Sequence, residues 1–264
     1  MTFFSLPPTL AARTNRIALR DPAFISDLHL NAAQPATRAA FVRFCAELAP
    51  QHAELVILGD LFEFWAGDDD QDPVGQDVAG ALAQLAQRGV RVYLMHGNRD
   101  LLLGSAFCAR AGARLLADPT LALVDGRGVL LAHGDAYCTR DEDYMKFRRK
   151  ARGALFQKLF LTRPLAQRRA LIGQARATSE AAKAVKAMEI MDVTPSEVEL
   201  AMAKTGVRTL IHGHTHRPGR YPHEIGGQSA TRWVLPDWDL DAAPPRGGYL
   251  RLRGGEWELA GIAA

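Results

Sequence analysis

Five short stretches of this chain share one design, in which an apolar run typical of a buried strand is followed by side chains that can bind a metal ion. In the first, Phe24-Ile25 precedes Asp27 and His29, whose side chains share a face because residues i and i+2 of an extended segment point the same way. The later stretches end in Asp60, in Asn98, in His133, and in His214 with His216. This recurrence predicts that seven oxygen and nitrogen donors meet in one site.

Each of these residues has an ordinary explanation when it is taken alone. Asp60 after a strand is typical of a turn or a helix cap, Asn98 is typical of a turn, and His133 is typical of a partly buried histidine. Two observations argue against applying these separate explanations to all of the residues at once. The residues recur at strand ends, and every stretch except the first has an adjacent glycine that permits close approach. We therefore interpret all seven as metal ligands.

The donor set indicates the kind of metal. Mixed imidazole and carboxylate ligands suit first-row divalent ions such as Mn, Fe, Zn or Co. Seven protein donors exceed what one ion with an open position needs, so they predict two ions with one bridging carboxylate. Two ions roughly 3.5–4 Å apart can lower the pKa of a water molecule and hold the oxygens of a phosphoryl group.

The order of the predicted elements limits the fold. The predicted strands are 24–25, 55–58, 90–95, 115–124, 129–132, 209–211, 231–235, 249–253 and 256–262, and the first predicted helices are 35–48, 74–87 and 101–110. Early alternation and a strand-rich tail predict an α/β fold, in which an open sheet carries helices outside and a second sheet packs on the first. Ligands bind such sheets beyond the carboxyl ends of the strands, where the five polar stretches lie.

The 264 residues are enough for one large domain. We divide them into a loosely ordered N-terminal extension (1–20) and a domain (21–264) with a helical insertion at about 139–195. Three cysteines without regular spacing argue against a disulfide framework and fit a reducing cytoplasm. No apolar run approaches the roughly 20 residues that span a bilayer, and we find no signal peptide. We expect the acidic run 68–70 to be a solvated turn.

The insertion is both basic and apolar. Between residues 146 and 186 a single acid, Glu180, stands against twelve bases: Lys146, Arg148, Arg149, Lys150, Arg152, Lys158, Arg163, Arg168, Arg169, Arg176, Lys183 and Lys186. A solvated face over a small core explains most such helices. The sharper interpretation is an amphipathic surface for an anionic amphiphile or a membrane. Nucleic acid competes with it, because basic patches bind phosphate backbones, but the block has few aromatic residues: Phe147, Phe156 and Phe160.

The ordered motifs resemble those of the calcineurin-like metallophosphoesterases over about 190 residues; they are Asp27-Leu28-His29, Gly59-Asp60, Gly97-Asn98-Arg99-Asp100, His133-Gly134-Asp135 and Gly213-His214-Thr215-His216. The resemblance implies a four-layer α/β/β/α sandwich with a helical lid insertion. It also implies the ligand sets: Asp27, His29 and His216 for the first ion, Asn98, His133 and His214 for the second, and Asp60 as the bridge.

One departure narrows the resemblance. The broad family usually has a histidine after the asparagine, where this chain has Arg99. Arginine stays charged and can fork onto phosphate oxygens, but it does not donate a proton readily. Arg99 is the pattern of the UDP-2,3-diacylglucosamine hydrolases, to which the stretches 26–30, 61–65 and 187–193 are also similar. The resemblance implies catalytic roles for Asn98, Arg99 and His214, and substrate contacts from Asn98, Arg99, Asp141, Ser179, Lys183, Lys186 and His214, with Tyr144 and Arg176 as lesser candidates.

This resemblance implies a hydrolase with two divalent metal ions, expected to be Mn²⁺. It would cleave the diphosphate of UDP-2,3-diacylglucosamine at the α-phosphorus, giving UMP and 2,3-diacylglucosamine 1-phosphate for lipid A biosynthesis. We expect a cytoplasmic location, peripheral contact with the inner membrane, and no nucleic-acid partner. A cyclic-nucleotide phosphodiesterase or nuclease with the same two-metal site is the alternative. A metal-free binding scaffold ranks lower, because all seven ligands are present.

Overall fold

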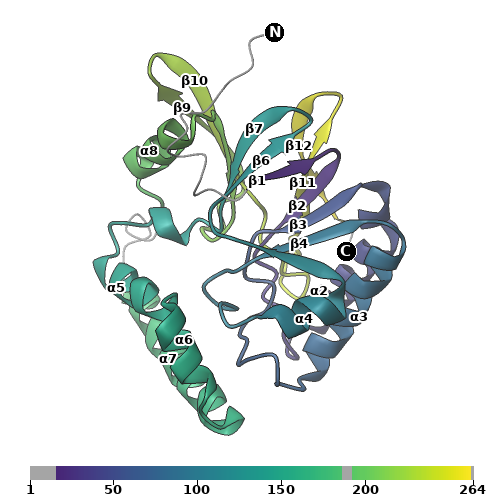
Figure 1. The fold of residues 1–264 in the computed structure, drawn as a ribbon, viewed down its shortest axis with the longest axis vertical. Coiled ribbons are helices and arrows are strands. Elements are labelled where there is room, and N and C mark those ends of the chain that lie inside the picture. Colours follow the sequence, from purple (N-terminus) through teal and green to yellow (C-terminus); the bar gives the residue numbers. More distant parts are fainter. Residues whose placement is uncertain (1–15, 186–191, 263–264) are drawn as a thin grey trace.

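The computed structural model describes residues 16–185 and 192–262. Its strands form two six-stranded sheets that face each other (Figure 1). Sheet A contains, in spatial order, β1 (Arg16–Leu19), β6 (Thr120–Val124), β7 (Arg127–Leu131), β8 (Thr209–His212), β10 (Gln228–Val234) and β9 (Gly219–Ile225). Sheet B contains β12 (Glu256–Gly261), β11 (Gly248–Arg253), β2 (Pro22–Ile25), β3 (Glu54–Ile57), β4 (Arg91–Met95) and β5 (Ala113–Leu116).

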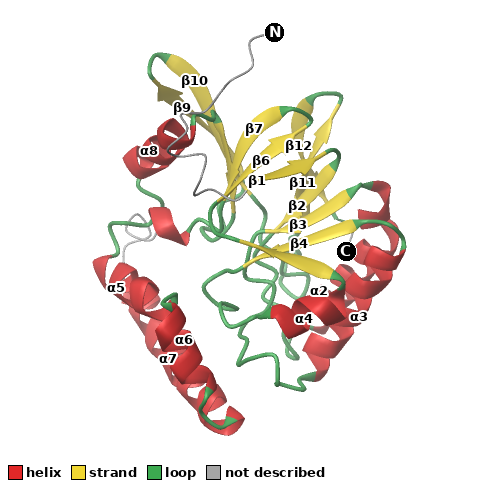
Figure 2. Ribbon diagram, viewed as in Figure 1, coloured by secondary structure: helices red, strands yellow, loops and turns green. Residues whose placement is uncertain are grey.

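Side-chain alternation along the strands builds three hydrophobic cores. In β2, Phe24 points into the core between the two sheets, whereas Ala23 and Ile25 point outward to the core beneath α2 (Pro35–Glu47), α3 (Pro73–Gln87) and α4 (Ser105–Ala111). In β8, Leu210 points outward to a third core, beneath α8 (Pro195–Thr205). This period of two is what a strand with both faces buried requires. The layers are therefore helix, sheet, sheet and helix, which confirms the predicted sandwich (Figure 2).

Parallel pairing brings the five motifs to one edge. β2, β3 and β4 pair in parallel in sheet B, and β7 pairs with β8 in parallel in sheet A. Each of these five strands runs directly into one of the polar stretches. Because carboxyl ends of parallel strands meet at the same edge, the metal-binding candidates converge where the two sheets face each other.

The insertion forms a group of helices beside the sandwich (Figure 1). It follows a short 3₁₀ turn (Asp135–Tyr137) and contains α5 (Glu142–Ala151), α6 (Ala154–Leu161) and α7 (Leu165–Val185). Two prolines of this region lie between helices or at a helix start. Pro164 precedes α7, and Pro195 occupies the first turn of α8, where its missing N–H costs nothing. A second 3₁₀ turn, Ala49–Gln51, follows α2.

Two local expectations were wrong, and two strands were not expected. The strand expected at 115–124 is two strands, β5 and β6, in different sheets, because Pro119 has no N–H for a ladder and the chain changes layers there. Residues 16–19 of the expected extension form β1, which pairs with β6. The helix expected at 101–110 begins later, at Ser105. β9 was missed because its side chains are largely polar and partly exposed.

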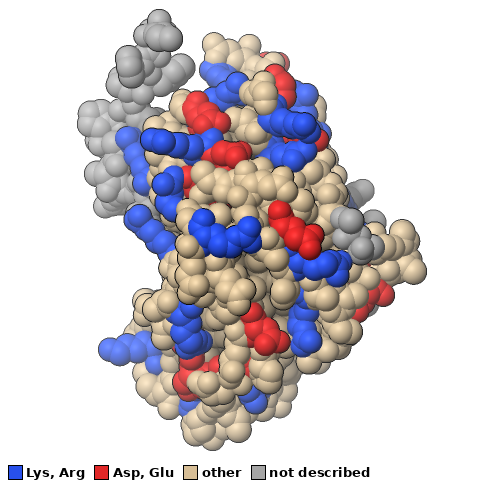
Figure 3. Space-filling view, turned by 90° about the vertical axis from the view of Figure 1, so that its right-hand side faces the viewer, with Lys and Arg blue, Asp and Glu red and all other residues tan. Residues whose placement is uncertain are grey.

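The surface gives two further observations. On the face drawn in Figure 3, lysine and arginine side chains are interspersed with aspartate and glutamate. That face therefore carries no broad area of one charge sign, in line with the formal net charge of +3. Within the described ranges, we find no helix with the length and apolar character needed to cross a membrane.

Candidate dinuclear metal centre

The predicted ligands fall into two groups of converging donor atoms. One group is Asp27, His29 and His216, and the other is Asp60, His133 and His214; within each group the ligand atoms lie within 4.8 Å of one another. Nε2 of His29 and Nε2 of His216 are 3.3 Å apart. The structure thus places six of the seven predicted ligands in two adjacent sets of three.

Asp60 lies between the two groups. Its Oδ2 atom is 3.7 Å from Nε2 of His29 and 3.8 Å from Nε2 of His133. The seventh predicted ligand, Asn98, places its Oδ1 atom 3.1 Å from Nε2 of His133. A carboxylate within reach of both groups has the position that a bridging ligand needs, and Asn98 lies beside His133, with which the family resemblance groups it.

The backbone at the ligands is unusual. Six described residues other than glycine have a positive φ, and five of them are predicted ligands: Asp27 (56°), His29 (49°), Asp60 (51°), His214 (68°) and His216 (51°). The sixth, Asp125, lies in a surface hairpin turn. Left-handed backbone is uncommon outside glycine and persists where the surrounding structure imposes it, which is frequent at functional sites.

Two glycines permit the close approach of these loops. A Cβ atom at Gly97 would overlap the Asp60 carboxylate, and a Cβ atom at Gly213 would overlap the side chains of Ser26 and Asp27. The predicted role of the adjacent glycines is therefore confirmed at these two positions. Any larger residue must displace a ligand carboxylate.

Three of the four histidines of the site have a neighbouring oxygen atom at the other ring nitrogen. Nδ1 of His29 lies 2.7 Å from a Glu63 carboxylate oxygen, and Nδ1 of His133 lies 2.9 Å from the Leu58 carbonyl oxygen. Nδ1 of His216 lies 3.6 Å from Asp237. Such contacts fix the ring so that Nε2 faces the site, which is the usual arrangement around metal-binding histidines.

Burial and charge set the protonation of the site. Burial alone would lower the pKa of His133, but the charges of Asp60, Asp135 and Asp27 outweigh it and raise that pKa to about 9. Burial, together with the charge of His133, lowers the pKa of His214 to about 4. Near neutral pH, these shifts favour a protonated His133 and a neutral His214. The positive charge of a protonated His133 lies among the carboxylates of Asp60, Asp135 and Asp27, as the charge of a bound metal ion would.

These features fit two divalent metal ions. Ligands of both groups are donors that first-row ions prefer, and the buried carboxylates supply negative charge with little access to water. His216 is exposed at the rim, so the site opens to solvent on that side. Two ions here would each bind through three or four protein atoms, which would leave positions for substrate.

Comparison with known proteins identifies the family of this chain. Residues 22–218 match the calcineurin-like phosphoesterase family. The chain belongs to this family. A protein of Ralstonia nicotianae named UDP-2,3-diacylglucosamine hydrolase is 50% identical over 259 residues, covering 94% of this chain and 95% of the relative. One of the same name from Pseudomonas paraeruginosa is 52% identical over 216 residues, covering 82% and 90%. A solved archaeal phosphodiesterase has 11% identity and a TM-score of 0.46, covering 92% of this chain and 99% of its own.

Family membership confirms the enzyme class predicted from the motifs. The chain is a metallophosphoesterase, a metal-dependent hydrolase. It matches its curated relatives over most of their length, insertion included. The resemblance to the UDP-2,3-diacylglucosamine hydrolases, which rested on Arg99 and three further stretches, is therefore confirmed.

The predicted substrate contacts are placed in part. The Arg99 side chain is 13% exposed, and its guanidinium lies 3.7 Å from Glu63, with which Arg176 of α7 also pairs. Asp141 is the N-cap residue of α5, where it accepts the Tyr144 N–H at 3.1 Å. Ser179 and Lys183 lie on α7, but their side chains are outside the described set, and Lys186 lies outside the described residues. The ring of Tyr144 stacks on the ring of His214, and the two ring centroids are 5.9 Å apart.

One expectation about a charged segment needs partial correction. The acidic run does form a turn with Asp69 exposed, but its carboxylates have protein partners. Asp68 caps the start of α4, while the other two pair with arginines of α7, Asp69 with Arg168 and Asp70 with Arg169. Basic residues of the insertion, among them Arg168 and Arg169, therefore contact the sandwich. Its exposed bases include Arg149, Lys150, Lys158 and Arg163.

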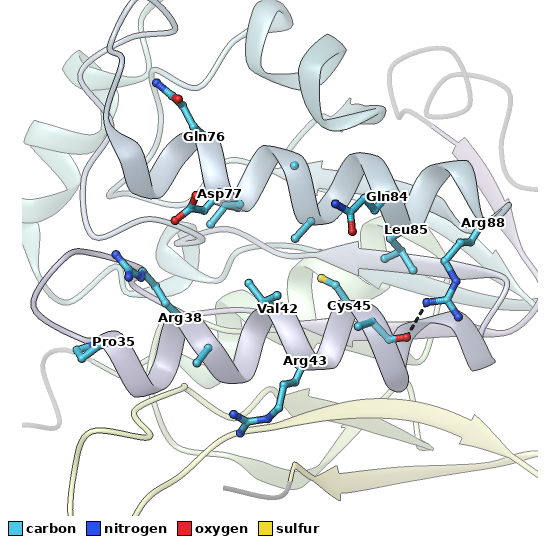
Figure 4. A pocket seen from close by; sticks show the side chains of 15 residues that line it. Pro35, Arg38, Val42, Arg43, Cys45, Gln76, Asp77, Gln84, Leu85 and Arg88 are labelled. Atoms are coloured by element: carbon cyan, nitrogen blue, oxygen red, sulfur yellow. Dashed lines mark hydrogen bonds between the residues drawn. The ribbon is translucent and has the colours of Figure 1, made fainter.

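Sequence reasoning missed the residues that orient the ligands. Glu63 follows Asp60 by three residues in an aromatic loop, and Asp118 lies inside what reads as one strand. Asp237 carried a usable signal, because it follows the apolar end of β10 as the ligands follow theirs. A groove of about 730 Å³ lies elsewhere, between α2 and α3, and its lining residues include none of the predicted ligands (Figure 4).

Proposed function

We propose that this protein hydrolyses UDP-2,3-diacylglucosamine at the α-phosphorus, giving UMP and 2,3-diacylglucosamine 1-phosphate for lipid A biosynthesis. The observation that supports this most directly is the pair of facing donor groups with Arg99 beside them, where the broad family has a histidine. The names of the relatives supply the substrate. In the reaction, water attacks the α-phosphorus, the bond from that phosphorus to the bridging oxygen breaks, and the sugar phosphate leaves.

The metal ions would be held by Asp27, His29 and His216 on one side, by Asn98, His133 and His214 on the other, and by Asp60 between them. Mn²⁺ is the ion we propose, and two such ions would acidify the attacking water and neutralise phosphoryl charge. The chain itself adds positive charge through Arg99, whose guanidinium can fork onto phosphate oxygens. Glu63 holds that guanidinium near the ligands, so the arginine is in place before substrate binds.

The insertion would recognise the rest of the substrate. We propose that Asp141, Ser179, Lys183 and Lys186 contact it, and that the apolar helices cover the acyl chains as a lid. On α6, Leu155 and Leu159 lie one turn apart and are 71% and 60% exposed, beside the exposed Lys158. Apolar side chains among bases are typical of helices at an anionic membrane surface. This supports cytoplasmic, peripheral contact with the inner membrane.

The test is Mn²⁺-dependent release of UMP from UDP-2,3-diacylglucosamine, with bis-p-nitrophenyl phosphate and a cyclic nucleotide run in parallel. Asp60→Asn should lose roughly 10³-fold or more in kcat, since one carboxylate serves both ions. Asp125→Asn is the matched control, because Asp125 is exposed and shares the left-handed backbone of Asp60.

Efficient UMP release with little turnover of the other two substrates is the expected result. Turnover of the small diesters without the lipid substrate would instead favour a phosphodiesterase or nuclease. Full activity of the Asp60 variant in Mn²⁺-saturated buffer would refute the bridging role.

A further inference from the structure

One face of α5 is aimed at the metal centre. Tyr144, Arg148 and Arg152 are spaced four residues apart on this helix and its C-cap, so they lie in a row. All three reach the buried Asp135: the Tyr144 hydroxyl donates to its Oδ2 at 2.7 Å, Nε of Arg148 lies 2.9 Å from Oδ2, and Arg152 lies 3.2 Å from the same oxygen. The Asp135 carboxylate of the sandwich thus contacts three side chains of the insertion.

A second carboxylate extends this contact. The Asp118 side chain is nearly fully buried, and its Oδ2 atom lies 3.3 Å from Arg148 and 3.3 Å from Arg152. Its other oxygen accepts the backbone N–H of His133 at 3.1 Å. Asp135, in turn, follows His133 by two residues. Asp118 therefore holds the loop that carries this ligand, Asp135 belongs to that loop, and the arginine partners of both carboxylates come from the insertion.

Arg152 also reaches a second ligand loop. Its guanidinium donates to the carbonyl oxygens of His96 and Gly97, at 3.3 and 3.4 Å, directly before Asn98. A third loop is touched by Tyr144, whose ring stacks on His214. The side chains on this face of α5 therefore contact each of the three loops that carry Asn98, His133 and His214.

The charges explain why this row is needed. In the described part of the chain, the cations that pair with Asp118 and Asp135 are Arg148 and Arg152. Without them, two buried carboxylates would face each other next to the carboxylates of the site itself. A buried ion pair that loses one partner leaves an uncompensated charge, so the loops would have to move.

We propose that Arg148 and Arg152 are positioning residues for the second metal-ion group, and that they couple the seating of the insertion to metal binding. The inference rests on the two-ion site of the proposed function, but not on its substrate. Coupling of this kind is reciprocal. A bound second ion should hold α5 in place, and a seated α5 should raise the affinity of that ion.

A purely structural role is the competing explanation. In that case the arginines fasten the insertion to the sandwich, and the metal sites do not depend on them. The two explanations differ in metal affinity, because only the positioning role requires a change in one ion and not in the other. The first group (Asp27, His29, His216) lies outside the contacts of both arginines and serves as an internal reference.

The experiment is a titration of metal-free full-length protein with Mn²⁺, by calorimetry and by the electron paramagnetic resonance signal of the coupled ion pair. Wild type should bind two ions. Arg152→Gln should weaken one ion by roughly 10–100-fold, the usual effect of losing a residue that orients metal ligands, and leave the other within about twofold. Arg149→Gln is the matched control, since Arg149 is exposed on the same helix. It should bind as wild type.

Two further measurements guard against misfolding of the variant. Arg152→Lys keeps the charge without the fork and should recover much of the lost affinity. In wild type alone, hydrogen exchange should slow at the amides of α5 and α6 when Mn²⁺ is added. Equal affinities in wild type and Arg152→Gln, or exchange in α5 and α6 that ignores Mn²⁺, would overturn the proposal. Binding of fewer than two ions by wild type would overturn it together with the two-ion site, whereas failure of UMP release alone would leave it standing.

Discussion

The proton on His133 makes metal binding depend on pH. Burial alone would lower the pKa of this imidazole, but three neighbouring carboxylates raise it to about 9. A metal ion at Nε2 must expel that proton. The raised pKa favours the protonated ring, so protons compete better as pH falls. We therefore expect the affinity of the second group for Mn²⁺ to rise with pH throughout the range below 9.

The size of this effect distinguishes the raised pKa from an ordinary one. For a pKa of about 9, the deprotonated fraction grows by roughly 90-fold between pH 6 and pH 8, equivalent to about 2.7 kcal/mol of binding free energy. For an unperturbed histidine with a pKa of about 6.5, the growth is only about fourfold. His214 adds little, because its pKa of about 4 leaves it neutral over this range.

The assay is Mn²⁺ titration by calorimetry at pH 6, 7 and 8, in buffers of different ionisation enthalpy that report proton release. The pKa of His29 is also raised: burial lowers it, but Glu63 and Asp60 outweigh burial. The second ion is therefore followed in a His29→Asn variant, in which the first group is incomplete. About one proton should leave per ion at pH 7. An affinity that gains only about fourfold from pH 6 to pH 8 would refute the electrostatic argument.

Three other predictions follow from the geometry. Gly97→Ala should abolish most activity by displacing the Asp60 carboxylate, whereas Gly80→Ala, with open space at its Cβ position, should leave kcat unchanged; both are measured as Mn²⁺-dependent UMP release. Leu155→Ser combined with Leu159→Ser should weaken sedimentation with anionic vesicles by at least about tenfold, because burying one leucine gains roughly 1.5–3 kcal/mol. Removing metal with EDTA should lower the melting temperature in calorimetry, since ligand at 100 times its Kd stabilises a site by roughly 2.7 kcal/mol.

Much of the candidate site could be predicted because its signal is local. An apolar run and the polar residue after it lie within a few positions, and the same pattern recurs before Asp60 and before His133. The parallel register of β2, β3 and β4 then brings together the motifs that follow these strands. Layer order was predictable for the same reason, since alternation of strands and helices is read along the chain.

The contacts between distant segments could not be predicted. In the sequence, Asp118 looks like part of a strand. Only the change of sheet between β5 and β6 brings its carboxylate to the backbone N–H of His133. The arginines of α5 read as a basic surface, yet Arg148 and Arg152 are partners of buried acids. Charge composition counts the residues of each sign, but it does not say which of them pair, because pairing depends on tertiary contacts far apart in sequence.

The grouping of the ligands shows why the site needs both sheets. Asp27 and His29 follow β2 of sheet B, but their partner His216 follows β8 of sheet A. In the other group, Asp60 follows a strand of sheet B, and His133 follows one of sheet A. Each ion would therefore join the two sheets, at a separation set by the apolar core between them. The left-handed backbone at the ligands is the local consequence, because a strand must turn at once toward the opposite sheet for its side chain to reach a shared ion.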